Sequence, residues 1–179
     1  GAMGNQMVLT GTLTFDQTRI STVSSRVEGR IERLYFKNIG DFVSKGARLF
    51  DLYSEALNNA KQEYLLAVQK RKILGNTVID FDQVIESAKN KLHLWGLSEA
   101  QISSLQNDGD NTVTSFYSTE SGYITNLNVQ QGEYVSEGAT IFQLAGLSTL
   151  WVEAQVYTAQ LSQLNKSAKA TVSIPDIPG

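Results

Sequence analysis

Residues 40–52 read GDFVSKGARLFDL, and residues 132–144 read GEYVSEGATIFQL. The two stretches align without a gap and share both glycines, the Val-Ser pair and the Ala-x-x-Phe that follows. Both stretches are short, rich in residues that favour strands, and punctuated by glycines that fit tight turns. The chain therefore contains a duplicated β unit, and this duplication decides the fold.

The similarity extends toward the N-terminus of each copy, over Ser25 to Leu52 and over Ser118 to Leu144. These earlier parts match less closely, and the first copy carries one extra residue near Asn38-Ile39. Six glycines recur at equivalent positions, and we expect them to supply turns that require positive φ. They are Gly29, Gly40 and Gly46 in the first copy and Gly122, Gly132 and Gly138 in the second.

One copy alone is too small to bury its apolar face. Two copies packed together would form one β-sandwich or flattened barrel. The predicted core consists of equivalent apolar positions, namely Val43, Leu49 and Leu52 in the first copy and Val135, Ile141 and Leu144 in the second.

The segment between the copies has helical spacing. Apolar residues recur at three- and four-residue steps in two stripes, which predicts two antiparallel helices in a hairpin. The stripes are Leu57, Ala60, Tyr64, Ala67 and Val68, then Phe81, Val84, Ile85, Ala88, Leu92 and Trp95. Gly75-Asn76 separates the helices and Gly96 ends the second. Ser98 with Gln101 forms a capping box that predicts a short third helix.

Alternating segments flank the duplicated unit on both sides. Residues 8–15 and 150–156 read as strands, Thr158 can cap a short helix, and residues 170–174 read as a last strand. We therefore expect a second β domain assembled from both chain ends, with too few strands to close a barrel.

Composition excludes several classes of function. The 179 residues include 41% apolar residues and carry a net charge of −3, which argues against nucleic acid as a partner. No cysteine is present, and no nucleophile motif or acid–base constellation points to an enzyme. Asp80 and Asp82 are explained by the dipole at a helix start. His93 and Met7 each stand alone, so we predict no metal site and no cofactor.

Four segments, in chain order, carry a resemblance to a known family. They are residues 25–46, the hairpin entry at 52–65, its exit at 94–102 (LWGLSEAQI) and the return strand at 147–154 (LSTLWVEA). Together they resemble the heavy-metal-efflux branch of the periplasmic adaptor, or membrane-fusion, proteins of the HlyD/RND family. The resemblance covers nearly the whole chain from Val8 onward.

The resemblance implies a mainly β fold with an inserted α-helical hairpin, a lipoyl-like barrel-sandwich hybrid and a partial β-barrel domain. We expect a cleaved-tag remnant, disordered, at residues 1–6 and β-barrel strands at 7–22. The lipoyl-like halves would occupy residues 23–53 and 113–147, with the hairpin and third helix at 54–112. Residues 148–179 would form the truncated part of the barrel domain.

The implied function is structural. Such an adaptor links an inner-membrane resistance-nodulation-division (RND) transporter to an outer-membrane channel of the TolC type, in a pump that exports metal ions or drugs. It would lie in the periplasm, anchored to the inner membrane, and form a ring with copies of itself, a hexamer in the pump. An adaptor of an ABC-type exporter remains an alternative. A lipoyl or biotinyl carrier domain is a further one, although neither Met-Lys-Met nor Asp-Lys-Ala occurs in the chain.

The resemblance also implies that the hairpin tip meets the outer-membrane channel. The predicted bend comprises Arg71, Lys72, Ile73, Leu74, Gly75 and Asn76. Ile73 and Leu74 would either offer an apolar contact to the partner or close the core of the hairpin itself. Flexible turns between modules are expected around Arg26, Ser54, Thr114 and Gly146.

Overall fold

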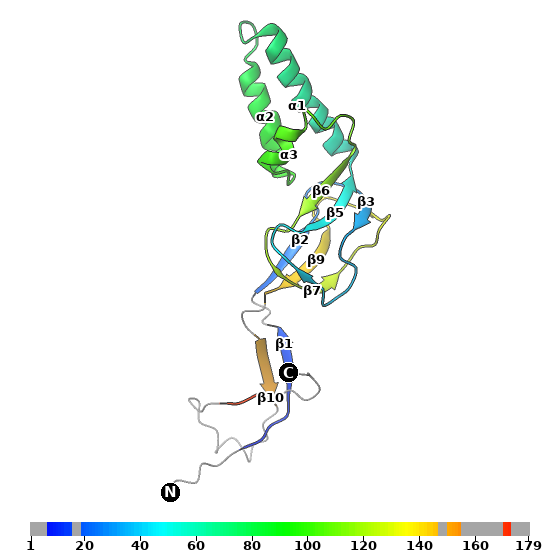
Figure 1. Cartoon of the computed structure of the whole chain (residues 1–179), viewed down its shortest axis with the longest axis vertical. Coiled ribbons are helices and arrows are strands. Elements are labelled where there is room, and N and C mark those ends of the chain that lie inside the picture. Colours follow the sequence, from blue (N-terminus) through cyan, green and yellow to red (C-terminus); the bar gives the residue numbers. More distant parts are fainter. Residues whose placement is uncertain (1–6, 16–18, 147–149, 155–169, 173–179) are drawn as a thin grey trace. The chain divides into compact units, whose positions relative to one another are not determined.

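The computed structural model describes residues 7–15, 19–146, 150–154 and 170–172. These residues belong to two compact units, one that runs from residue 16 to residue 149 and one that joins the two ends of the chain. Figure 1 shows the elements of both units in chain order. The predicted disorder of residues 1–6, the helix after Thr158 and residues 173–174 of the last strand lie outside the described residues.

The larger unit contains a sandwich of two four-stranded antiparallel sheets. One sheet has the order β2-β9-β7-β4 and the other has the order β6-β5-β3-β8. Each copy is counted here with the strand that directly precedes it. The strands of the first copy are then β2 (Ile20–Ser24), β3 (Gly29–Leu34), β4 (Phe42–Val43) and β5 (Arg48–Tyr53). Those of the second copy are β6 (Val113–Tyr117), β7 (Gly122–Leu127), β8 (Tyr134–Val135) and β9 (Thr140–Ala145).

The two copies interleave, because each sheet takes two strands from each copy. Backbone hydrogen bonds also join the two copies, and equivalent residues make equivalent bonds in both directions. Gly46 N donates to Ser118 O while Gly138 N donates to Ser25 O, both at 2.7 Å. Gly40 N and Gly132 N likewise donate to the carbonyls of Ile124 and Ile31, again at 2.7 Å. Neither copy can therefore satisfy its own backbone.

The sandwich core lies where the duplication predicted it. All six predicted core residues are at most 3% exposed, and Val43, Leu52 and Ile141 are fully buried. Phe50 and Phe142, the aromatic residues common to both copies, are also buried in this core. The prediction of a single core shared by both copies is confirmed.

The six repeated glycines serve two different purposes. Gly40, Gly46, Gly132 and Gly138 have φ between 83° and 93°, as predicted. Gly29 and Gly122 do not have positive φ, so that prediction was wrong for them. A Cβ at Gly29 would lie 2.5 Å from the Tyr53 carbonyl oxygen, and one at Gly122 would lie 2.9 Å from that of Ala145. At these two positions glycine is required by close backbone approach between paired strands.

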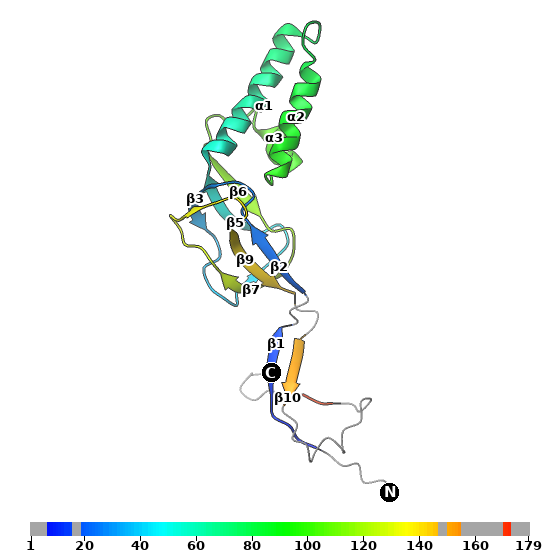
Figure 2. The ribbon, with the colours of Figure 1, turned by 180° about the vertical axis from the view of Figure 1, so that it is seen from behind.

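The helices are inserted between β5 and β6 (Figures 1 and 2). They are α1 (Glu55–Leu74), α2 (Phe81–Leu94) and the short α3 (Glu99–Ser104). The Ser98–Gln101 capping box is present, as predicted. The apolar stripes face each other, except that Val84 is 44% exposed.

Two of the four expected inter-module turns are not turns. Ser54 is 1% exposed and directly caps α1, where its Oγ accepts a hydrogen bond from Leu57 N. Thr114 is buried within β6. At Ser54, β5 runs into α1 without a loop, and Thr114 lies inside the strand that follows the helices.

The smaller unit contains one described sheet, in which β1 (Gly11–Phe15) pairs antiparallel with β10 (Leu150–Ala154). The strands predicted at residues 8–15 and 150–156 thus pair with each other. Residues 170–172, predicted to begin a last strand, have no strand assignment. Among the described helices, none is both long and apolar enough to cross a membrane.

Candidate partner-binding site

The tip of the hairpin is shaped by the end of α1 and the start of α2. Gly75 ends α1 with a φ of 64°, and its N–H donates to the Arg71 carbonyl at 3.1 Å. Asp80 caps α2, where its Oδ1 accepts from Gln83 N at 3.2 Å. Glycine at the first of these positions accommodates the left-handed backbone that reverses the chain.

A polar clamp formed by Arg71, Asn76 and Asp82 holds this turn closed. Arg71 Nε donates to Asp82 Oδ1 at 2.8 Å, and the Asn76 amide also donates to the Asp82 carboxylate. Asn76 Oδ1 accepts in turn from Phe81 N at 3.0 Å. Hydrogen bonds from Arg71 and Asn76 hold the pKa of Asp82 below its ordinary value. The clamp therefore stays charged and closed at neutral pH.

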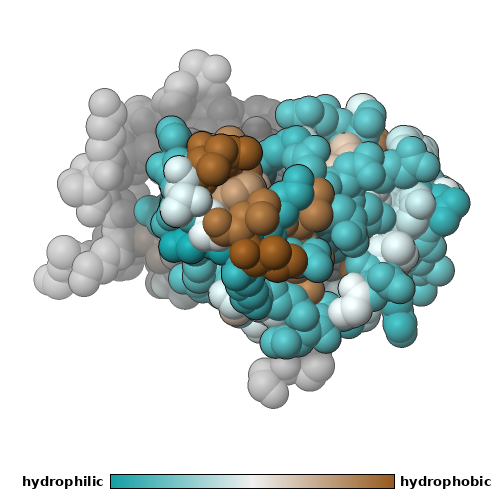
Figure 3. Space-filling view, turned by 90° about the horizontal axis from the view of Figure 1, so that it is seen from above, coloured by the Kyte–Doolittle hydropathy of each residue, from teal (hydrophilic) through white to brown (hydrophobic). Residues whose placement is uncertain are grey.

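Four apolar side chains remain outside the clamp. Ile73 is 70% exposed, Leu74 59%, Val78 93% and Ile79 51%. We call these four residues the apolar tip. Figure 3, which looks down on this end of the larger unit, shows apolar surface gathered within a polar surround. Ile73 and Leu74 do not close the hairpin core, and the apolar tip has the exposure expected of a contact surface.

The bend predicted at residues 71–76 begins a few residues too early, because α1 continues to Leu74. Arg71 to Leu74 form the last turn of α1, and Gly75 and Asn76 begin the bend. Lys72 Nζ donates to Gln106 Oε1 at 3.4 Å and takes no part in the clamp. Val78 and Ile79 were missed because they belong to neither helical stripe. Their position directly before the Asp80 cap, outside both stripes, was the available signal.

His93 near the end of α2 is held by local contacts. Its Nδ1 lies 3.0 Å from Leu97 O, and its Nε2 lies 3.0 Å from Glu99 Oε2. Lys89 forms an ion pair with the same Glu99 carboxylate. Within the described ranges no three His, Cys, Asp or Glu side chains are grouped to hold a metal ion.

The connection between the two copies differs from the one expected of a lipoyl or biotinyl carrier domain. A lipoyl or biotinyl carrier would present its lysine on a tight turn at this point. Here the connection from Tyr53 to Val113 contains all three described helices. The tight turn is replaced by the hairpin and its apolar tip.

Comparison with known proteins matches residues 20–145 to the family described as CusB, barrel-sandwich hybrid domain. The chain belongs to this family. As a CusB-type barrel-sandwich hybrid, it has the fold class that the duplicated unit and the inserted hairpin predicted. The resemblance to adaptors of the heavy-metal-efflux branch is confirmed.

Two curated relatives support the assignment. The cation efflux system protein CusB of Escherichia coli O6:H1 is 26% identical over 93% of the chain. The cobalt-zinc-cadmium resistance protein CzcB of Cupriavidus metallidurans is 29% identical over 91% of it. The CusB-type chain spans only 39% and 34%, respectively, of these two relatives.

Among solved structures, ZneB from Cupriavidus metallidurans has the same fold. It superposes with a TM-score of 0.54 at 22% identity, over 88% of this chain and 73% of ZneB.

Proposed function

We propose that this chain is part of the periplasmic adaptor of a tripartite efflux pump. In this role it links an inner-membrane RND transporter to an outer-membrane channel of the TolC type. Its contribution is structural, because it positions partner-binding surfaces and does not perform chemistry. The native protein lies in the periplasm, anchored to the inner membrane.

The observation that carries this proposal is the apolar tip on the inserted hairpin. Its four side chains lie at the far end of two packed helices, and a clamp of charged and amide groups fixes their turn. A soluble domain that presents apolar residues on a rigid projection gains nothing unless a partner covers them. A helical end of a channel offers matching grooves for such side chains.

The substrate class we favour is metal cations. Both curated relatives carry names that refer to cation efflux or to resistance against cobalt, zinc and cadmium. Export of drugs is the alternative. The described residues supply no metal-ligating group of three, so the cation would be selected by other parts of the pump.

The proposed adaptor also assembles with copies of itself, as a ring and most simply as a hexamer. A ring would seal a conduit between the two membranes, with the sandwiches side by side and the apolar tips at one end. The interleaved sheets suit this role because each sheet contains strands of both copies, so one copy cannot unfold without disrupting the other.

The test is affinity capture of the full-length protein from native cells after crosslinking in place. The wild type is compared with Ile73→Asp, which places a charge in the apolar tip. Leu94→Asp is the matched control, because Leu94 is 75% exposed but lies at the opposite end of α2. We expect the wild type and Leu94→Asp to recover both a transporter and an outer-membrane channel. Ile73→Asp should recover the transporter alone.

Loss of the channel from both variants, or from neither, would contradict the role of the tip. Recovery of an ABC-type exporter in place of the RND transporter would assign the adaptor to the other pump class. Recovery of acyltransferase or carboxylase subunits, with added mass on a lysine, would replace the adaptor by a carrier domain.

A further inference from the structure

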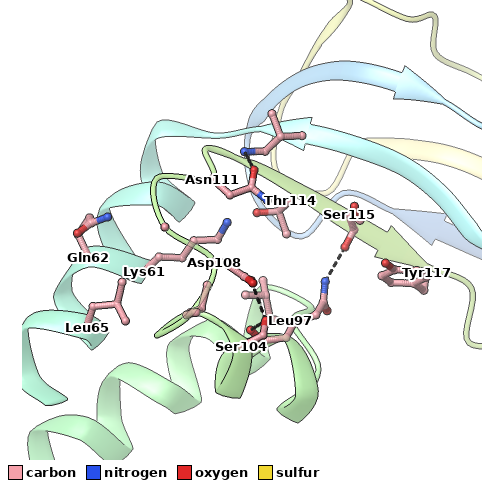
Figure 4. A pocket seen from close by; sticks show the side chains of 14 residues that line it. Lys61, Gln62, Leu65, Leu97, Ser104, Asp108, Asn111, Thr114, Ser115 and Tyr117 are labelled. Carbon is pink, nitrogen blue, oxygen red and sulfur yellow. Dashed lines mark hydrogen bonds between the residues drawn. The ribbon is translucent and has the colours of Figure 1, made fainter.

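A second site lies at the base of the hairpin, away from the apolar tip. A cavity of about 230 Å³ opens between α1, the end of α3 with the loop after it, and β6. Figure 4 shows Lys61 of α1, Asp108 of the loop and Thr114 of β6 around this cavity. One buried water needs only about 10–15 Å³, so the space is large enough for a small organic molecule.

Lys61 is a buried cation without a partner. It is 6% exposed, and among the described residues its ammonium group makes no hydrogen bond or ion pair. Burial lowers its pKa, and Asp108 is the charge that acts against this effect. Yet no Lys61 nitrogen lies within the 4.0 Å that defines an ion pair with Asp108. Lys61 Nζ is not among the fully buried side-chain atoms without a partner, so it still reaches the open space of the cavity.

Thr114 lies on the same wall, but its hydroxyl is out of reach of a molecule in the cavity. It is 5% exposed, and its Oγ1 is fully buried without a hydrogen-bond partner among the described residues. Neighbouring polar groups are already engaged. Ser115 Oγ donates to Asp51 Oδ1 at 2.9 Å, and Gln101 Nε2 donates to Ser115 O at 2.8 Å. Lys61 is therefore the group on this wall that is left to bind something from the cavity.

The opposite wall offers an acceptor. Asp108 Oδ2 accepts from Ser104 Oγ at 2.8 Å, whereas Oδ1 accepts no hydrogen bond from a described residue. The cavity thus has a cation on one side and a carboxylate on the other, and the two do not pair directly. A molecule that carries both charges would satisfy both walls.

We propose that this cavity binds a small zwitterion of the amino-acid class. Its carboxylate pairs with Lys61 Nζ, and its ammonium group donates to Asp108 Oδ1. Because the walls belong to α1, the loop after α3 and β6, the bound molecule fastens the hairpin to the sandwich. The site does not depend on what the pump exports.

The experiment is a titration of the ¹⁵N-labelled chain, followed by nuclear magnetic resonance. The probes are glycine, β-alanine and γ-aminobutyrate, which differ in the distance between their charges. Propionate and ethylamine each present one charge alone. We expect at least one zwitterion to give saturable shifts at Lys61, Asp108 and Thr114, with tighter binding than either single-charge probe.

Four variants assign the contacts. Lys61→Met should weaken zwitterion binding by about tenfold or more, because a charge-assisted contact is lost, whereas Thr114→Val should leave it unchanged. Asp108→Asn should bind the zwitterion no better than propionate. Lys70→Met, an exposed lysine on the same helix outside the cavity, should leave binding unchanged.

Two outcomes would overturn the proposal. Equal binding of propionate and the zwitterions to the wild type would show a site for simple anions. Absence of saturable shifts with every probe would show that water alone fills the cavity. Circular dichroism of each variant confirms that a lost signal does not reflect unfolding.

Discussion

The two halves of the sandwich, residues 25–52 and 118–144, share a backbone but differ on their outer faces. Inside, both halves use the same apolar positions, the same positive-φ glycines and reciprocal hydrogen bonds. Outside, the first half carries a polar cluster on Asp51, and the second half has Gln143 at the equivalent position. The fold therefore depends on the inward residues and the turns, which leaves the outer faces free to differ.

The cluster on Asp51 shows how far the two faces have diverged. Arg48 binds the carboxylate through two nitrogens at 2.9 Å, and Tyr35 Oη donates to it at 2.8 Å. Burial and the hydrogen bond to Asp51 raise the pKa of Tyr35. In the second half, Gln143 Oε1 accepts only from Asn126 Nδ2 among the described side chains.

The largest expected loss of stability comes from substituting Gly29 and Gly122, the equivalent glycines within strands of the two halves. Gly29→Ala should lower the free energy of unfolding by about 3 kcal/mol and Gly122→Ala by about 2 kcal/mol, because each Cβ meets a carbonyl oxygen. The ranking follows the distances of 2.5 and 2.9 Å. Urea denaturation measures both.

The control for these variants is Gly146→Ala, where a Cβ meets nothing within 4 Å. It should change stability by no more than about 0.5 kcal/mol. If Gly29→Ala behaved like this control, the two strands would not need their close approach.

The next largest effect compares Asp51 with Gln143, the equivalent positions at which the outer faces of the two halves differ. Asp51→Ala should cost about 2 kcal/mol, because a nearly buried carboxylate that accepts several hydrogen bonds is removed. Gln143→Ala, at the equivalent position, should cost less than about 1 kcal/mol. The same denaturation series provides the comparison. In the Asp51 variant the pKa of Tyr35, followed by ultraviolet titration, should fall. Equal costs at the two positions would mean that the polar cluster adds no stability.

The smallest effect concerns the hairpin, which lies between the two halves. Because the pKa of Asp82 is depressed in the folded chain, its contribution is present above its ordinary pKa of about 3.9 and is lost as pH falls through the depressed value. Acidification should therefore lower the protection factors of the tip amides, which are corrected for the intrinsic exchange rate at each pH, and leave those of the sandwich turns unchanged. Asp82→Asn should remove this pH dependence. A uniform response of tip and sandwich would argue against a local clamp.

Much of this architecture was predictable from local patterns. The duplicated motif identified the core through residues such as Val43 and Val135, and the apolar stripes with Ser98 identified the helices. The exchange of strands between sheets was not predictable, because equivalent positions do not say which copy each strand will pair with. The close approach at Gly29 depends on how β3 lies against β5 and could not be inferred from glycine alone. Val78 and Ile79 belong to no periodic pattern, so only the turn geometry shows their exposure.

The exchange of strands between the copies also has a consequence for the order of assembly. The turn hydrogen bond of Gly46 needs Ser118, and that of Ser25 needs Gly138. During synthesis β3 and β5 can pair within the first copy, whereas β2 and β4 have no partner until β9 and β7 of the second copy have emerged. The hairpin makes local contacts and can form in microseconds, whereas the sandwich requires slow, long-range closure. We expect the helices to be complete while the sheets that hold them are still unfinished.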